Sequence, residues 1–380
     1  MLDGAPSESA TPAVVALNSG RGRSPYLVSL TGASIRQMAT SLSGLVAVLI
    51  AAAIFTPGFY AEANLVLVAQ QIGFIGVAAL GQTFCLLVAG IDLSVGAVSG
   101  MTMVVLAVVS GGSNSRLWLA ILLAIGLGIG IGIVNAILVT WRSAPPFVAT
   151  FATFTLVEGA LLAWTSGAPS GSIPAALVPL GAGNLWGVPA PLFVFLGLLI
   201  VSGFVLTRTT YGRRLYATGS NPTTARMSGI PTRTLFFSAY IVCAMTAVLV
   251  GLLLSGYIGF VDYQLINSIN LNCIAAAVIG GTTFAGGEGG VFRTTIGVIV
   301  LACLLSFMLL LNTGNAGQLI LEGAVILGAV WLQTGTRSIR YGRRMAVSVA
   351  GTNGGASDAS SGSSQAGSAD TYGSNSEIGK

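Results

Sequence analysis

Four acidic side chains stand within or beside long apolar stretches of this sequence: Asp92, Glu158, Glu288 and Glu322. Where such a stretch crosses a bilayer, a carboxylate at its centre costs a few kcal/mol or more, so it must face protein or water. Glu158 and Glu322 each precede a glycine. For these two, the sequence leaves three roles open: carrying protons, binding sugar hydroxyls, or pairing across helices.

Asp92 differs because it lies between two apolar stretches, in Gly90-Ile-Asp-Leu-Ser-Val-Gly96. A carboxylate placed just before a helix accepts hydrogen bonds from the first free backbone N–H groups. We therefore predict that Asp92 is the N-cap of the next helix, in preference to an ion-coupling group. Glu288 occupies a similar place in the later segment Gly286-Gly-Glu-Gly-Gly290.

Neutral amides also lie within the apolar stretches, at Gln82 and Asn135. An amide donates and accepts hydrogen bonds without carrying charge, which suits a neutral polyol. We predict a translocation path lined by Gln82, Asn135, Glu158 and Glu322.

Several kinds of chemistry are excluded by what the sequence lacks. The chain has no histidine, and its only lysine is Lys380, so it has no Walker-type Gly-x-x-x-x-Gly-Lys motif for binding ATP. The cysteines form no Cys-x-x-Cys pair and are expected to be small buried apolar side chains. They are Cys85, Cys243, Cys273 and Cys303. We expect no enzyme, no metal site, no cofactor and no nucleic-acid partner.

The elements that position these residues are expected to be membrane helices. The chain is 54% hydrophobic and 7% charged, whereas soluble domains carry about 25% charged residues. A membrane helix needs about 20 apolar residues, which predicts an all-α bundle of about ten spans. The third and eighth are the least secure, so eight spans also fit. The segments are 38–56, 65–90, 93–111, 117–141, 147–165, 190–207, 235–256, 271–284, 291–312 and 318–335.

The basic residues orient this bundle. With ten spans and the N-terminus inside, only Arg116 among the basic residues falls on the outer side, which places both termini in the cytoplasm. Residues 1–36 and 337–380 are expected to be disordered cytoplasmic tails, because neither can bury enough apolar area to order itself. The transmembrane domain then spans residues 37–336. Residues 166–190, an uncharged outer loop, are expected to cover the pore mouth.

Glycines occur in two patterns. In the span 117–141, Gly126 and Gly130 share one face and Gly128 and Gly132 another. This spacing lets helices approach closely, and we favour packing within one subunit over a subunit interface. The two acid-bearing glycine turns each end an inward span and begin an outward one, which indicates an internal repeat.

Four segments resemble signatures of the ribose/xylose/arabinose-type permeases of ATP-binding-cassette (ABC) sugar importers, within the branched-chain amino acid/sugar permease superfamily. The resemblance covers residues 40–335 approximately. It departs from the family at Glu158 and Glu322, where basic residues are common. The four segments are Gly90–Gly100, Pro146–Thr150, Thr210–Ile230 and Ile274–Gly290.

The inner loop 208–234 is similar to the main cytoplasmic loop of that family. Asn221-Pro222 is a helix-start signal and Gly229 a left-handed helix end. The resemblance implies that this short helix docks on a separate ATPase, although a basic loop of this kind also anchors to anionic lipid. The coupling residues are expected to be Gly219, Asn221, Pro222, Ala225, Arg226, Gly229 and Ile230. The two glycine turns that they would move contain Gly90, Asp92, Ser94, Gly96, Gly286, Gly287 and Glu288.

The resemblance further implies a periplasmic sugar-binding protein, a second permease copy forming a homodimer, and transport of a ribose-, xylose-, arabinose- or galactose-like monosaccharide across the bacterial inner membrane. Two alternatives stay open: a proton-coupled secondary transporter using Glu158 or Glu322, and an ABC permease for branched-chain amino acids.

Overall fold

The computed structural model describes residues 32–168, 171–261, 263–314, 316–320, 323–324 and 327–328. Within these ranges the regular secondary structure is helical apart from one hairpin of two short strands, β1 (Asn184–Leu185) paired antiparallel with β2 (Val188–Pro189). The predicted all-α class is therefore confirmed for the described residues. Residues 1–31 and 337–380 of the expected tails, and Glu322 with most of the predicted tenth span, lie outside them. The prediction of a disordered tail was wrong for residues 32–36, which form the start of α1.

Six helices are long and apolar enough to cross a membrane, and three more are apolar but shorter, at Ser41–Phe55, Val95–Ser110 and Ser268–Ile279. The shorter ones include the third and eighth predicted spans. The ten-span count stays a prediction. The helices that contain these nine apolar segments are α1 (Gly32–Phe55), α2 (Glu62–Leu87), α3 (Val95–Ser110), α4 (Leu117–Thr140), α5 (Pro146–Thr165), α7 (Ala190–Arg208), α10 (Thr232–Ile258), α11 (Tyr263–Ile279) and α12 (Val291–Leu310).

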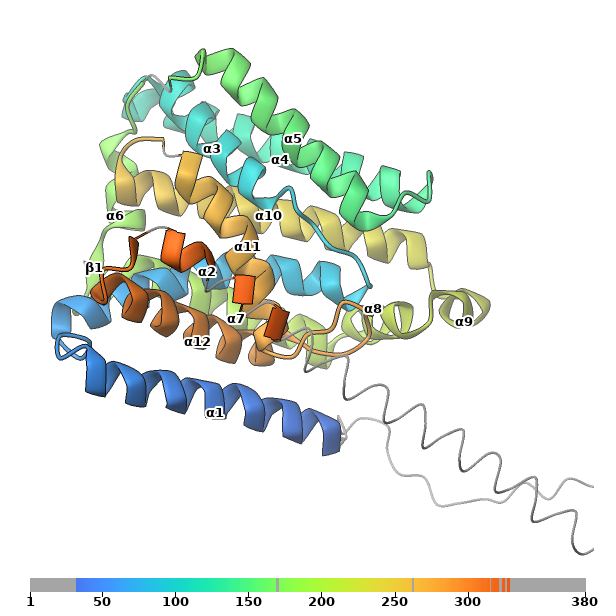
Figure 1. Ribbon diagram of the computed structural model, residues 1–380. Coiled ribbons are helices and arrows are strands. Elements are labelled where there is room, and N and C mark those ends of the chain that lie inside the picture. The colour runs from blue at the N-terminus through green and yellow to red at the C-terminus, as the bar shows by residue number, and fades with distance from the viewer. Residues whose placement is uncertain are drawn as a thin grey trace, which may run out of the picture.

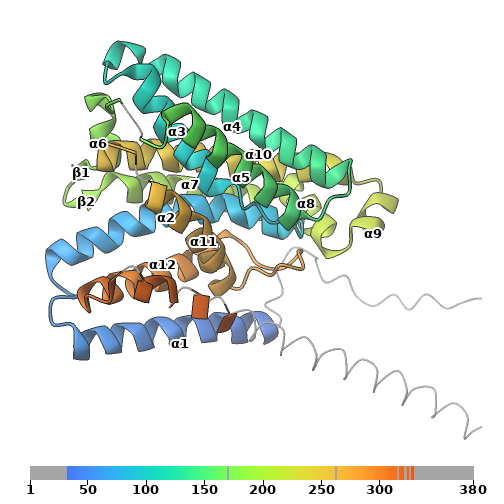
Figure 2. The ribbon, with the colours of Figure 1, turned by 45° about the horizontal axis from the view of Figure 1, so that its top comes forward.

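Helix α2 forms the centre of the bundle. It packs against α10, α7, α12 and α11, and every residue from Gly73 to Leu87 is buried. Figures 1 and 2 show the long helices lying side by side, with α1 at one edge and α4 and α5 at the opposite edge. α1 packs mainly on α12, where Ser306 donates a hydrogen bond to Asn64 Oδ1 of α2 at 2.9 Å.

The outer loop is ordered into short elements: a 3-10 turn (Ala175–Leu177), α6 (Val178–Gly181) and the β1–β2 hairpin. α6 packs on both α10 and α7, and the Ala176 N–H donates to Asn114 Oδ1 at 3.1 Å. The loop therefore lies over the outer ends of several helices. The prediction that it covers a pore mouth is not tested by this packing.

The two glycine faces of α4 have different surroundings. A Cβ on Gly132 would lie 3.1 Å from the Ala244 Cβ of α10, and one on Gly128 would overlap Val248. Gly126 and Gly130 have nothing within 4 Å of the same position. The preferred interpretation, packing within one subunit, thus holds for Gly128 and Gly132, because these residues let α10 approach the α4 backbone.

Replacing Gly132 with leucine should lower the stability of the purified protein. Forcing a large side chain into a close-packed contact costs about 1–3 kcal/mol, and the Tyr240 carbonyl is also only 3.1 Å from the added Cβ. The thermal unfolding midpoint in detergent measures this. Gly130→Leu is the matched control and should unfold as the wild type does. Equal midpoints for the two variants would contradict the assigned faces.

Candidate functional site

The inner loop folds into two short helices, α8 (Thr210–Ser220) and α9 (Pro222–Met227), which project past the ends of the long helices (Figures 1 and 2). Asn221 joins them as the N-cap of α9, and its Oδ1 accepts from the N–H groups of Thr223 at 3.1 Å and Thr224 at 3.0 Å. Gly229 has φ +77° just after the helix. The predicted start and end of this helix are confirmed.

Ala225, which the sequence analysis named as a coupling residue, lies on the covered face of α9. Ala225 is 4% exposed and packs inward, whereas Met227 is 86% exposed. A six-residue helix turns its apolar positions in different directions, and only tertiary contact shows which one is covered. Met227 is therefore the apolar side chain that α9 exposes, and the sequence analysis missed it. Asn221, Pro222, Arg226 and Gly229 are exposed beside it.

The end of α8 meets the end of α2 and the second glycine turn at one point. The last carbonyls of a helix lack partners within it, and the Leu87 carbonyl of α2 accepts from the Gly287 N–H of the second turn at 2.9 Å. The Tyr216 hydroxyl of α8 donates to the Gly289 carbonyl of the same turn at 3.1 Å. Hydrogen bonds to backbone carbonyls therefore join the end of α2, helix α8 and the second glycine turn, which are remote from one another in the sequence.

Gly219 lies inside this junction. A Cβ there would overlap the Leu87 carbonyl oxygen and lie 2.6 Å from the Gly287 nitrogen. Gly286 is equally confined, since its Cβ would lie 2.7 Å from the Ala89 nitrogen of the first turn and 2.8 Å from the Gly219 carbonyl. Gly286 and Gly287 also have φ of +77° and +69°, a conformation that glycine adopts without steric cost.

Asp92 is not the N-cap of α3, and that prediction was wrong. The helix begins later, at Val95, with Ser94 as its N-cap residue. Asp92 Oδ1 instead accepts from the Ser94 N–H at 2.8 Å and from the Ser94 hydroxyl at 2.5 Å. This is a turn closed by the aspartate side chain two residues upstream. The broader expectation that Asp92 organises the first glycine turn agrees with these contacts.

Gln82 and Asn135 bind that same turn. Asn135 of α4 donates to the Ser94 hydroxyl at 2.9 Å and more weakly to Asp92 at 3.4 Å. With its amide oriented to satisfy both groups, Gln82 of α2 donates to the Asp92 carbonyl at 3.1 Å and accepts from its N–H at 3.3 Å. Both amides are fully buried. In this structure Gln82 bonds the backbone of the first turn and Asn135 bonds its side chains.

Two glutamates that the sequence analysis singled out, Glu158 and Glu288, lie elsewhere. Glu158 is half-buried on α5, which packs mainly on α3 and α4 at the edge of the bundle. The Glu288 carbonyl accepts from the Thr283 N–H at 3.2 Å and closes the second turn. The structure therefore brings Asp92, Ser94, Gln82 and Asn135 together and leaves Glu158 apart from them.

All four cysteines are buried and unbridged. Among the described residues, one group has metal-ligand types: Cys85, Asp92 and Cys243, whose ligand atoms lie within 4.8 Å of one another. Thiols must lose their protons to bind a metal ion, and full burial among apolar side chains opposes that. We interpret the group as packing of small side chains around the turn.

Comparison with known proteins matches residues 64–330 to the family described as the permease component of the branched-chain amino acid transport system. The ribose import permease protein RbsC of Bacillus subtilis is 35% identical over 293 residues, which cover 76% of this chain and 90% of that protein. The Escherichia coli K12 protein of the same name is 31% identical over 294 residues, covering 76% and 91%. The autoinducer 2 import system permease protein LsrC of Salmonella typhimurium is 32% identical over 252 residues, covering 66% and 72%.

The chain belongs to this permease family. No solved structure matches it. The family expected from the four motifs is confirmed, and all four lie within the matched residues. The permease is a multi-pass inner-membrane protein, as its family and its six long apolar helices indicate.

In the permease, Gly219→Ala should destabilise the junction between α8 and the two turns. The added methyl group must displace the Leu87 carbonyl, which breaks close packing at a cost of about 1–3 kcal/mol. The unfolding midpoint of the purified permease measures the loss. Gly197→Ala on α7 is the control, because nothing lies within 4 Å of the added Cβ. An unchanged midpoint in Gly219→Ala would show that the junction is loosely packed.

Asp92→Asn should be tolerated, because the carboxamide oxygen can accept the two Ser94 bonds that Asp92 Oδ1 accepts. Asp92→Ala should lose about 1–3 kcal/mol of stability, since it leaves buried donors without an acceptor. Unfolding midpoints and solute uptake in cells test both variants. A stable Asp92→Asn permease without uptake would instead assign ion coupling to the carboxylate.

Proposed function

We propose that this permease is the membrane-spanning subunit of an ATP-driven importer, and that a separate ABC ATPase docks on α9. The observation that carries the proposal is the path from Met227 to the junction. Met227 is exposed at the end of the short helix, and Gly219 of the preceding helix touches the end of α2 and the second glycine turn. A displacement of α9 would reach the end of α2 and the second turn through these close backbone contacts.

The substrate is a small neutral polyol of the monosaccharide class. This rests on the relatives, two of which are ribose import permeases, and on the scarcity of charge along the described spans. In the described part of the chain, the helices long enough to span a membrane contain two carboxylates. These are Glu62, at the start of α2, and Glu158, within α5. A homodimer of permeases would enclose the path, with both termini in the cytoplasm as the arginine distribution indicates.

The outer partner is a periplasmic sugar-binding protein, and Trp186 offers it a contact. Trp186 is 92% exposed at the tip of the β1–β2 hairpin. Its φ of +52° is followed by +82° at Gly187, and two such residues form the tight turn favoured between antiparallel strands. A non-glycine residue in this conformation carries backbone strain, and such strain is often found at binding sites. Aromatic side chains are also enriched at protein interfaces.

Charged substitutions at the two ends test the proposal together. Met227→Asp should reduce the amount of ATPase subunit that co-purifies from native membranes by about tenfold or more, because a central apolar anchor contributes about 2 kcal/mol or more to binding. Trp186→Asp should leave the ATPase bound and weaken binding of the sugar-binding protein. Quantitative mass spectrometry of the purified complex measures both partners.

Each variant is the control for the other, since both add a charge at an exposed apolar position. Membrane levels of both should equal the wild type. A permease that purifies without an ATPase subunit, and transports its solute in liposomes under a proton gradient, would overturn the proposal. Sugar uptake that stops on ATP depletion and survives an uncoupler is the expected result in cells.

A further inference from the structure

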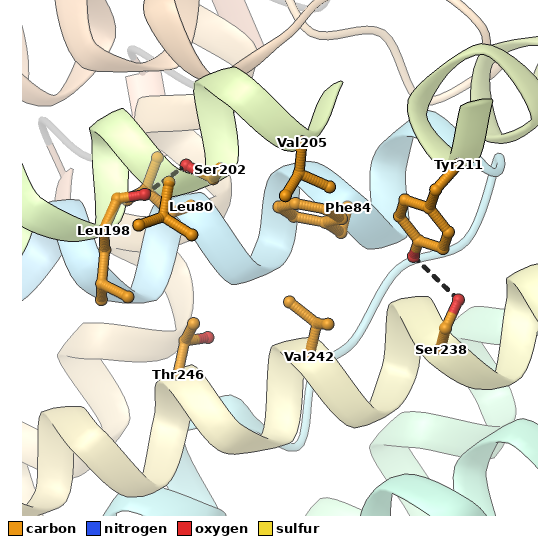
Figure 3. A pocket seen from close by; sticks show the side chains of 10 residues that line it. Leu80, Phe84, Leu198, Ser202, Val205, Tyr211, Ser238, Val242 and Thr246 are labelled. Carbon is orange, nitrogen blue, oxygen red and sulfur yellow. Dashed lines mark hydrogen bonds between the residues drawn. The ribbon is translucent and has the colours of Figure 1, made fainter. Parts of the chain in front are cut away.

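A groove on the side of the bundle lies between α7 and α10, both of which pack on α2. Figure 3 shows its construction: Leu80 and Phe84 of α2 lie between the two outer helices, and Tyr211 of α8 closes one end. The cavity has a volume of about 380 Å³. The remaining lining residues are Leu198, Val201, Ser202 and Val205 of α7, and Ser238, Val242 and Thr246 of α10.

The hydroxyl groups in the groove are already occupied within the protein. Ser202 donates to the Leu198 carbonyl at 2.6 Å and Thr246 to the Cys243 carbonyl at 2.8 Å. Tyr211 and Ser238 bond each other at 2.8 Å, and Ser238 also donates to the Leu235 carbonyl at 2.9 Å. The groove therefore presents an apolar lining with no free donor, which suits hydrocarbon and disfavours a sugar.

The length and position of the groove match one leaflet of a bilayer. Val201 is 59% exposed, so the groove is open on its outward side. From Leu198 to Arg208 the helix rises by ten residues at 1.5 Å each, or about 15 Å, which is half of the roughly 30 Å hydrocarbon core. A second helix, about 10–12 Å wide with its side chains, is too large for this cavity.

Positive charge lies at the inner end of the groove. Leu198, Val201 and Val205 follow the spacing of one helix face, and Arg208 continues it. Arg214 stands one turn after Tyr211 on α8. Both arginines are exposed, and neither forms an ion pair with another residue of the described chain. Between Glu158 and Asp262 the sequence contains no acidic residue at all.

We propose that this groove binds one acyl chain of an anionic phospholipid, whose phosphate is held by Arg208 and Arg214. With the arginine-rich side facing the cytoplasm, the groove opens to the inner leaflet, where anionic lipids attract basic segments. Guanidinium groups bind phosphate oxygens in a bidentate manner. Because Tyr211 belongs to α8, the bound lipid would hold the helix that leads to the Gly219 junction.

Filling the groove tests the acyl-chain part of the proposal. Val201→Trp places an indole in the groove, while Ile200→Trp, at a 70% exposed neighbour outside it, is the matched control. Each permease is purified in mild detergent, and its retained lipid is identified by mass spectrometry. Phosphatidylglycerol retained by the wild type should fall at least about tenfold in Val201→Trp, because retention scales with the buried chain, and should stay unchanged in Ile200→Trp.

Should Val201→Trp fail to fold, as judged by size-exclusion chromatography, Val205→Trp on the same wall replaces it. Equal retention in the groove variant and in Ile200→Trp would overturn the proposed site.

Removing one positive charge tests the headgroup part. Arg208→Gln should lower the retention of phosphatidylglycerol relative to phosphatidylcholine, whereas Arg142→Gln, an exposed arginine on the inner turn after α4, should not. Added phosphatidylglycerol should also raise the unfolding midpoint of the wild type more than that of Arg208→Gln. Retention of free fatty acid alone, or equal effects of the two substitutions, would overturn the phospholipid assignment.

Discussion

The hydrogen bond between the Leu87 carbonyl and the Gly287 N–H is the contact on which the packing of α8, α2 and the second glycine turn depends. It links the end of the central helix α2 to the second glycine turn at 2.9 Å. Gly219 fits against it only because it has no side chain. Backbone groups in direct contact transmit small displacements better than flexible side chains, since close-packed regions have little room to deform. At this junction α8, the end of α2 and the second glycine turn are close-packed, so a displacement of one is expected to move the others.

Polar groups near the first turn obey the main constraint on proteins in lipid. Backbone that is not helical at membrane depth must be satisfied by protein, because no water is present to bond it. Gln82 supplies those bonds from α2 and Asp92 supplies one within the turn, while Asn135 of α4 bonds the Ser94 hydroxyl beside them. The three residues come from α2, the turn and α4, and all are fully buried. They make an irregular segment as well anchored as the helices around it.

The surface of the permease divides by chemistry as its location requires. Large apolar side chains are exposed along α4, α5 and α7, where lipid or a second copy would cover them. Met227 and Trp186 are exposed beyond the helix ends, where the medium is aqueous and an apolar side chain is stabilised by a partner. The groove between α7 and α10 combines both kinds of surface, because it is apolar along its length and basic at one end.

Much of this was predictable from the sequence, for local reasons. Apolar runs of about 20 residues identify membrane helices because lipid imposes a length. Asn221-Pro222 and Gly229 bound α9 because capping depends on neighbouring residues. The four motifs identified the family before any geometry was known. The glycine pattern of α4 predicted close approach, since small residues at that spacing allow it.

Tertiary structure decided what depends on partners distant in sequence. Ala225 and Met227 belong to the same short apolar pattern, and only packing shows that Ala225 is covered. Gln82 and Asn135 were predicted to line a solute path, and only tertiary structure shows that both bond the first turn. Asp92 bonds Ser94 instead of capping α3, because the helix begins later than its sequence indicates. The sequence by itself determined the apolar helices, the two ends of α9 and the family. The direction each polar group faces was decided by tertiary structure, because hydrogen bonds and steric contacts between remote segments are not encoded at any single position.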